Sequence, residues 1–187
     1  MHFGTIIILN GASGSGKTSI IQALQERLPI PALEMGLERF FGMLPRRDQE
    51  QLLRDDAPGT AGETMHRLVY GMHRAMHAAA QAGNVILTDH ALTERMWVND
   101  LANLFAGLPA YLIGVRCPLD VLTQRERSRK DHAPGRVAAQ FPLVHRYCVY
   151  DLEVDTAILS PEQCAVRILE RINAPPEALR RLKKPEA

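Results

Sequence analysis

Residues 11–18 read GASGSGKT and match the pattern G-x-x-x-x-G-K-[ST]. The preceding residues 5–9, TIIIL, form an uninterrupted aliphatic and β-branched run, which is typical of a strand buried on both faces of a parallel sheet. Apolar side chains then recur at helical spacing, at Ile20, Ile21, Leu24 and Leu28. A glycine-rich turn between such a strand and a helix offers backbone N–H groups and the helix dipole to an anion. The stretch therefore predicts a phosphate-binding loop, against the alternative of a Gly/Ser turn that ends by chance in Lys-Thr.

The motif gives each of its positions a role in holding a nucleotide. The glycines allow the backbone to turn its amides toward phosphate oxygens with no Cβ in the way. Lys17 is expected to bridge the β- and γ-phosphates, and the Thr18 hydroxyl to ligate a magnesium ion carried by the nucleotide. The expected nucleotide-binding residues of the motif are Gly11, Ala12, Ser13, Gly14, Ser15, Gly16, Lys17 and Thr18.

The composition is that of an ordinary globular protein, with 187 residues of which 46% are hydrophobic and 23% charged. We expect one domain over residues 1–174 and a loosely held tail over residues 175–187. A formal net charge of +1 gives no bulk attraction to nucleic acid or to a membrane surface. The sequence shows no export signal and no apolar run long enough to span a bilayer, so we expect a cytoplasmic protein without a nucleic-acid or membrane partner. It leaves homo-oligomerisation open.

Strand-like and helix-like segments alternate along the chain, which is the pattern of a parallel α/β sheet. Further strands are expected at residues 32–35, 85–89, 110–116 and 150–156. Helices are expected at residues 64–82, at residues 137–147 and after Ser160. An apolar loop is expected at residues 36–44 and an exposed connection at residues 45–62. The predicted fold is a three-layer α/β P-loop NTPase of the nucleoside- and shikimate-kinase type, with a five-stranded parallel sheet flanked by helices.

Asp89 ends the apolar segment of residues 85–89. Ligands of open α/β sheets bind beyond the carboxyl ends of the strands, so we expect Asp89 beside the phosphate loop. There its carboxylate would hold the magnesium ion, directly or through water, or touch the acceptor hydroxyl. The alternative is a turn or N-cap aspartate that serves the residues from Ala91 onward. On the helix of residues 64–82, the three histidines His66, His73 and His77 are expected to be solvated rather than to hold zinc.

Arginines gather in residues 125–136, before and after a Pro-Gly break. A basic helix end followed by a short Pro/Gly loop suits a lid over a triphosphate, where guanidinium groups stabilise charge on the transferred phosphoryl. Arg129 and Arg136, which lie nearest the break, are the expected contacts. The alternative for any single arginine is a solvated basic face.

Five segments resemble the chloramphenicol phosphotransferases in sequence and in order. They read IILNGASGSGKTSII, PALEMGLERFFGMLP, VILTDH, IGVRCP and VHRYCVYDLEVDT, and the resemblance extends to about Ile172. The phosphate-loop segment is generic, whereas the G-x-[DE]-x-x-x-x-x-x-P segment and the IGVRC strand are more specific. The resemblance implies transfer of the ATP γ-phosphoryl to a hydroxyl of a small molecule such as chloramphenicol, with ATP and Mg²⁺ as cofactors.

The family places an aspartate, as the base that takes the acceptor proton, two residues after the glycine that matches Gly36; this chain has Glu38 there. A glutamate can serve, because its unperturbed pKa is close to that of aspartate. Its side chain is one methylene longer, so the acceptor hydroxyl must sit further from the backbone or the pocket must differ. The alternative is that Glu38 is a solvated acid and Asp89 is the base.

Four catalytic residues are therefore expected: Glu38 from the resemblance, Lys17 from the phosphate-loop motif, Arg136 from the lid segment and Asp89 from its place at a strand end. The apolar side chains expected to enclose the acceptor are Met35, Phe40, Phe41, Met43 and Trp97, the last of which also suits a core position. Two other functions stay open. One is a kinase of a metabolite such as a sugar acid, nucleoside or nucleotide, and the other is a nucleotide-responsive regulatory protein without transfer activity.

Overall fold

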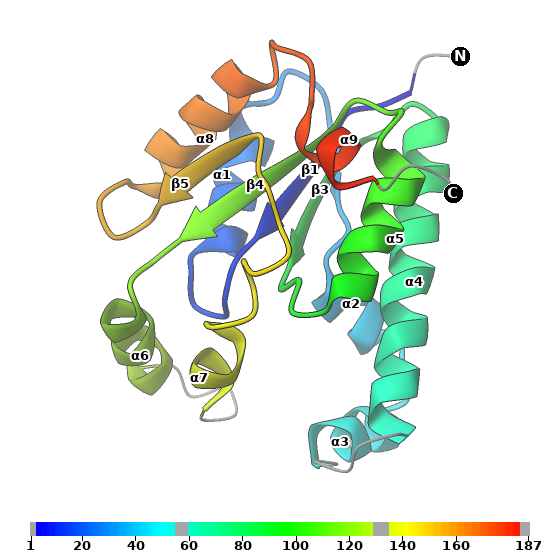
Figure 1. Ribbon diagram of the computed structural model, residues 1–187, viewed down its shortest axis with the longest axis vertical. Helices are drawn as coiled ribbons and strands as arrows, with labels where there is room; N and C mark the ends of the chain where they lie inside the picture. Colours follow the sequence, from blue (N-terminus) through cyan, green and yellow to red (C-terminus); the bar gives the residue numbers. More distant parts are fainter. Residues whose placement is uncertain (1–2, 55–59, 129–134, 184–187) are drawn as a thin grey trace.

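The computed structural model describes residues 3–54, 60–128 and 135–183, and builds them around one sheet with helices on both faces (Figure 1). The sheet has five strands in the order β2-β3-β1-β4-β5. In chain order they are β1 Ile6–Asn10, β2 Ala32–Glu34, β3 Val85–His90, β4 Ala110–Arg116 and β5 Leu152–Asp155. Every pairing between neighbouring strands is parallel, so the carboxyl ends of the strands meet at one edge. The predicted five-stranded α/β fold is confirmed.

The two faces of the sheet carry separate apolar layers (Figure 1). On one face α4 (Thr60–Gln81), α5 (Arg95–Phe105) and α9 (Ala178–Leu182) pack on a layer that includes Ile6 and Ile8 of β1. On the other face α1 (Lys17–Arg27) and α8 (Pro161–Arg171) pack on a layer that includes Ile7 and Leu9. Because alternate side chains of a strand point to opposite faces, the continuous aliphatic run of β1 fills both layers.

Two stretches for which the sequence predicts a loop or an exposed connection contain helices. Helix α2 (Leu37–Gly42) begins after Gly36, and α3 (Arg46–Arg54) begins after Pro45. The apolar residues of the first stretch find a partner in the layer under α4, since Leu37 and Phe40 pack against it. Tertiary packing therefore decides the conformation of a segment that is too short to form a stable helix alone.

Two helices flank the expected lid region, α6 (Leu119–Ser128) and α7 (Arg136–Gln140). The prediction of a helix over residues 137–147 is too long, because turns replace it from Phe141 onward. Arg129 and the rest of residues 129–134 lie outside the described residues.

The expected loose tail is wrong for α9, whose Ala178 and Leu179 are buried in the layer shared with α5. Among the described residues, no helix has the length and apolar character needed to span a membrane.

Candidate functional site

The phosphate loop follows β1 directly and leads into the first turn of α1. Gly14 and Gly16 have φ angles of 79° and 87°, a left-handed conformation that side chains with a Cβ rarely adopt. Gly16 is the N-cap of α1, and no side chain caps this helix end. The first-turn amides are therefore left to an outside acceptor, which is the arrangement that binds phosphate at a helix N-terminus.

Lys17 is almost fully buried at the base of this loop. Its Nζ donates hydrogen bonds to the carbonyl oxygens of Gly11 at 2.7 Å and Ala12 at 2.9 Å. These bonds hold the ammonium group against the loop, close to the position where the motif expects phosphate oxygens.

A cavity of about 620 Å³ opens over the loop. One wall is the loop and the start of α1, including Ser13, Gly14, Gly16, Lys17 and Thr18. The end of β3 adds Asp89 and His90, and α7 adds Arg136 and Gln140. The remaining wall is largely apolar and comes from α2, α3 and α4, namely Leu37, Phe41, Leu52 and Met65. The cavity thus joins a cationic, amide-rich end to an apolar end.

Asp89 lies at the junction of the two ends. Its carboxylate packs against Gly36, because a Cβ placed on that glycine would come within 2.1 Å of the Asp89 Oδ1. Burial raises the pKa of Asp89 above its ordinary value, the positive charge of Lys17 opposes this shift, and the negative charge of Glu38 adds to it. Asp89 is therefore a half-buried carboxylate whose ionisation responds to the charges of the loop lysine and of the expected base.

Glu38 lies in the first turn of α2 and lines the same cavity as Lys17 and Asp89. Its side chain is exposed, whereas Asp89 is half-buried. Residues that are 21 and 51 positions apart from Glu38 in the chain are therefore brought to one site, as the carboxyl-end placement of ligands in such sheets predicts.

The residues present fit a magnesium ion that arrives with a nucleotide. Thr18 and Asp89 supply a hydroxyl and a carboxylate to one cavity, and oxygen donors of this kind suit Mg²⁺. The described residues contain no group of three His, Cys, Asp or Glu side chains that could hold a metal by themselves. Most ligands of such an ion would therefore come from phosphate oxygens and water, which is how Mg²⁺ is usually bound in kinases.

Of the expected lid arginines, Arg136 lines the cavity at the start of α7. The neighbouring Gln140 accepts a hydrogen bond from the backbone N–H of Ser13 at 2.8 Å, which ties α7 to the phosphate loop. The other expected contact, Arg129, lies outside the described ranges.

The expected acceptor residues divide into two groups. Phe41 lines the cavity, but Met35 and Phe40 pack on the apolar layer under α4, and Met43 is exposed to solvent without lining the cavity. Trp97 is buried in the same apolar layer, so its position is that of a core anchor. Beside Phe41, the apolar wall of the cavity consists of Leu37, Leu52 and Met65.

The sequence profile of the family described as "Chloramphenicol phosphotransferase-like protein" matches residues 4–173. The chain belongs to this family. Two Mycobacterium tuberculosis proteins, each provisionally named an O-phosphotransferase, are 28% identical to it over 203 residues, covering 98% of this chain and 90% of theirs.

Among solved structures, a sugar kinase from Janibacter sp. is similar to this chloramphenicol phosphotransferase-like chain with a TM-score of 0.70 at 18% identity, over 97% of this chain and 99% of that one. The Mycobacterium tuberculosis APS kinase CysC, in complex with AMPPNP and APS, gives a TM-score of 0.67 at 16% identity, over 93% of this chain and 100% of that one. Identities this low show the fold alone, which is that of P-loop kinases. Family and fold together support a P-loop phosphotransferase.

In this chloramphenicol phosphotransferase-like chain, Arg125 holds the outer side of the phosphate loop, a role that the sequence did not reveal. Its guanidinium donates to the carbonyl oxygen of Gly14 at 3.1 Å, and to the Oγ1 and backbone oxygen of Thr156 at 3.2 and 2.9 Å. Thr156 in turn donates to the Ser15 carbonyl at 2.9 Å. Arg125 and Thr156 therefore fix the loop from two elements, α6 and the end of β5.

The start of the loop is fixed by Asn10, which is fully buried at the end of β1. Its Oδ1 accepts from the Leu92 N–H at 2.8 Å, and its Nδ2 donates to the Val144 carbonyl and the Tyr150 hydroxyl, each at 2.7 Å. Three segments far apart in the sequence thus meet at the residue before Gly11.

From His90 in the cavity wall, a series of polar side-chain contacts runs through the apolar layer under α4 and α5. His90 Nε2 lies 3.2 Å from His73 Nε2, and His73 Nδ1 lies 2.7 Å from the Asp100 carboxylate, which also pairs with Arg74. Burial lowers the pKa of both histidines, so each is neutral near pH 7. The expectation of a solvated His73 is wrong because the partner that allows its burial, Asp100, lies on α5 and is remote in sequence.

Proposed function

We propose that this protein is an ATP-dependent O-phosphotransferase that moves the γ-phosphoryl to a hydroxyl of a small, partly apolar molecule, as in antibiotic inactivation. The observation that carries the proposal is that Glu38 and Asp89 share one cavity with the phosphate loop, at its junction with an apolar wall. A nucleotide-binding loop needs no such wall, whereas an acceptor alcohol with an apolar body does.

In the proposed reaction, the acceptor oxygen forms a bond to the γ-phosphorus while the bond from that phosphorus to the bridging oxygen of ADP breaks. Glu38 takes the proton of the acceptor hydroxyl. The loop amides and Lys17 stabilise charge on the phosphates, and Arg136 approaches the transferred group from α7. A magnesium ion held near Thr18 and Asp89 would neutralise part of the triphosphate charge.

The charges around the cavity favour an acceptor that carries no negative charge. Among the described lining residues the cations are Lys17 and Arg136, next to the phosphate loop and on α7. The wall built by α2, α3 and α4 contributes Glu38 and apolar side chains. An anionic acceptor such as a sugar acid or a nucleotide would face Glu38 and Asp89 without a described cation on that wall, and like charges at close range are unfavourable.

The test is mass spectrometry of acceptor alcohols incubated with the protein and Mg-ATP. We expect chloramphenicol or another neutral, partly apolar antibiotic alcohol to gain one phosphoryl group, with one ADP formed per product. Gluconate and a nucleoside monophosphate serve as anionic comparisons. Phosphorylation of these anions alone would assign the protein to metabolite kinases. ATP binding without any product from a broad panel of alcohols would favour a regulatory nucleotide-binding protein.

A further inference from the structure

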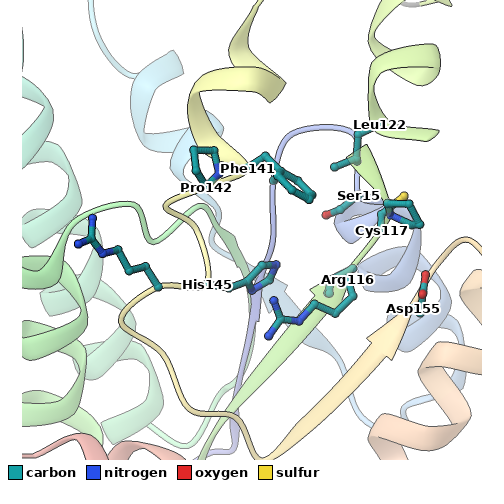
Figure 2. A pocket seen from close by; sticks show the side chains of 12 residues that line it. Ser15, Arg116, Cys117, Leu122, Phe141, Pro142, His145 and Asp155 are labelled. Atoms are coloured by element: carbon teal, nitrogen blue, oxygen red, sulfur yellow. The ribbon is translucent and has the colours of Figure 1, made fainter. Parts of the chain in front are cut away.

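A second cavity, of about 530 Å³, lies against the phosphate loop and is separate from the candidate active site (Figure 2). The two cavities share none of their described lining residues. The loop contributes Ala12 and Ser15 to the second cavity, while Ser13, Gly14 and Gly16 line the first. The loop is therefore a wall between two hollows, and a molecule in the second one would touch the loop without entering the nucleotide cradle.

The Ser15 hydroxyl is a buried donor on this wall. Ser15 is 1% exposed, and its Oγ has no hydrogen-bond partner among the described residues. Figure 2 shows this hydroxyl turned toward the space between Phe141 and His145. A buried hydroxyl without a partner is unfavourable, so a ligand atom that accepts a hydrogen bond from it would be stabilised.

His145 contributes a second donor, and its tautomer follows from its neighbours. Because the Asn10 Oδ1 accepts from Leu92, its Nδ2 is the atom that donates to the Tyr150 hydroxyl. The hydroxyl hydrogen of Tyr150 is then directed to the His145 Nδ1, 2.6 Å away. Burial lowers the pKa of His145 to about 4, so the ring is neutral and its proton is on Nε2. His145 lines the cavity, whereas Tyr150 does not. Since Nδ1 of His145 is bonded to Tyr150, the Nε2–H of the ring is the donor left for the cavity.

The rest of the lining combines two arginines, Arg116 and Arg146, and one carboxylate with apolar surface. The carboxylate is that of Asp155, whose Oδ1 accepts a hydrogen bond from the backbone N–H of Ala157 at 2.8 Å. The Nε of Arg116 donates a hydrogen bond to Glu153. The other N–H donors of its guanidinium are on the two terminal nitrogens. Val115, Leu122 and Phe141 supply apolar walls. The hollow thus presents three donors, from Ser15, His145 and Arg116, beside an apolar surface.

We propose that this hollow is a second small-molecule site, which takes a small carboxylate with an apolar body and changes the nucleotide affinity of the phosphate loop. The carboxylate oxygens would accept from the three donors, while the apolar body packs on Phe141 and Leu122. Coupling to the nucleotide follows from two contacts. Ser15 belongs to the loop, and His145 is connected through Tyr150 to Asn10, which precedes the loop.

The first test is an NMR titration of the isotope-labelled full chain with benzoate, and with benzylamine as a probe of the same ring but opposite charge. We expect benzoate to bind at concentrations of about 10 mM or below, with shifts at Ser15 and Cys117, and benzylamine to bind about tenfold more weakly. His145→Phe keeps a ring but removes the donor, and should weaken benzoate binding about tenfold. The control His77→Phe, on α4, should leave it unchanged. Equal binding of the two probes, or full binding to the His145→Phe variant, would overturn the site.

The second test measures the affinity for AMPPNP with and without saturating benzoate. The proposal predicts a ternary complex and an AMPPNP affinity altered about fivefold by benzoate. Mutually exclusive binding would show that the hollow belongs to the nucleotide site, and an unaltered affinity would show that the two sites are independent. Either result contradicts the proposal. Neither test depends on phosphoryl transfer, so a failure here leaves the proposed enzyme activity to its own experiment.

Discussion

The carboxylate of Asp89 lies so close to Gly36 that a Cβ on the glycine would come within 2.1 Å of Oδ1. The backbone of Gly36 has φ −83°, which any residue can adopt, so the requirement for glycine comes from the close approach and not from the dihedral angle. Gly36 also precedes α2, which carries Glu38. One short contact therefore sets the spacing between the two carboxylates of the cavity.

Gly36→Ala should displace the Asp89 carboxylate and lower phosphoryl transfer about 100-fold, since small misplacements of catalytic groups have effects of this size. Nucleotide affinity, measured by calorimetry, should change little because the loop is untouched. Gly42→Ala, at the other end of α2, is the matched control, because a Cβ there would meet no atom within 4 Å. If both variants turned over at the wild-type rate, the Gly36 contact would have no part in catalysis.

Asp89→Asn should stabilise the folded chain at neutral pH while impairing transfer. Because burial raises the pKa of Asp89 in the folded state, ionisation weakens folding at every pH above the pKa of the unfolded chain. The substitution removes this penalty, so thermal denaturation should give a higher Tm at pH 7. The difference should shrink as the pH falls and the native carboxyl becomes protonated. A variant less stable than wild type at pH 7 would contradict the assigned shift.

Asn10→Ala should destabilise the protein by about 2–4 kcal/mol, because it leaves a small void and removes the partners of three buried groups. Urea denaturation measures this loss. Asn103→Ala, at an exposed position of α5, is the control and should change stability by less than about 0.5 kcal/mol. Similar losses in the two variants would show that Asn10 does not organise the segments around the loop.

Arg125→Lys should raise the dissociation constant for AMPPNP about tenfold, because a lysine cannot donate from several nitrogens to Gly14 and Thr156 at once. Calorimetric titration gives the constant directly. Arg127→Lys, on the exposed side of the same helix, is the control. It makes the same change of residue type without changing the net charge, and its affinity for AMPPNP should equal that of the wild type. A wild-type dissociation constant in Arg125→Lys would mean that the loop keeps its shape without the Arg125 hydrogen bonds to Gly14 and Thr156.

The parts of the fold and site that could be predicted are those encoded in adjacent residues. The GASGSGKT loop, the strand before it and the helix after it are formed by one continuous stretch of sequence. The position of Asp89 beside the loop follows from the rule that ligands bind beyond the carboxyl ends of parallel strands. The resemblance to a known family pointed to Glu38, which lines the cavity together with Lys17.

The parts that could not be predicted depend on contacts between distant segments. The partners of Asn10 include Val144 and Tyr150, which are 134 and 140 residues away. Leu52 lines the apolar wall of the cavity, although it lies in a segment whose polar, proline-flanked composition predicts an exposed connection. Met43 and Phe40 are as apolar as Phe41, and only the packing of α2 decides which of the three faces the cavity.

We propose that Glu38 accepts the proton of an alcohol positioned against the γ-phosphoryl of ATP. The most direct measurement of this role is single-turnover transfer by Glu38→Gln, compared with the wild type and Glu38→Asp, on an acceptor found by mass spectrometry. We predict a rate at least about 100-fold lower for Glu38→Gln, with an AMPPNP affinity within about twofold of the wild type and partial activity in Glu38→Asp. A wild-type rate in Glu38→Gln would contradict the account and transfer the role of base to Asp89.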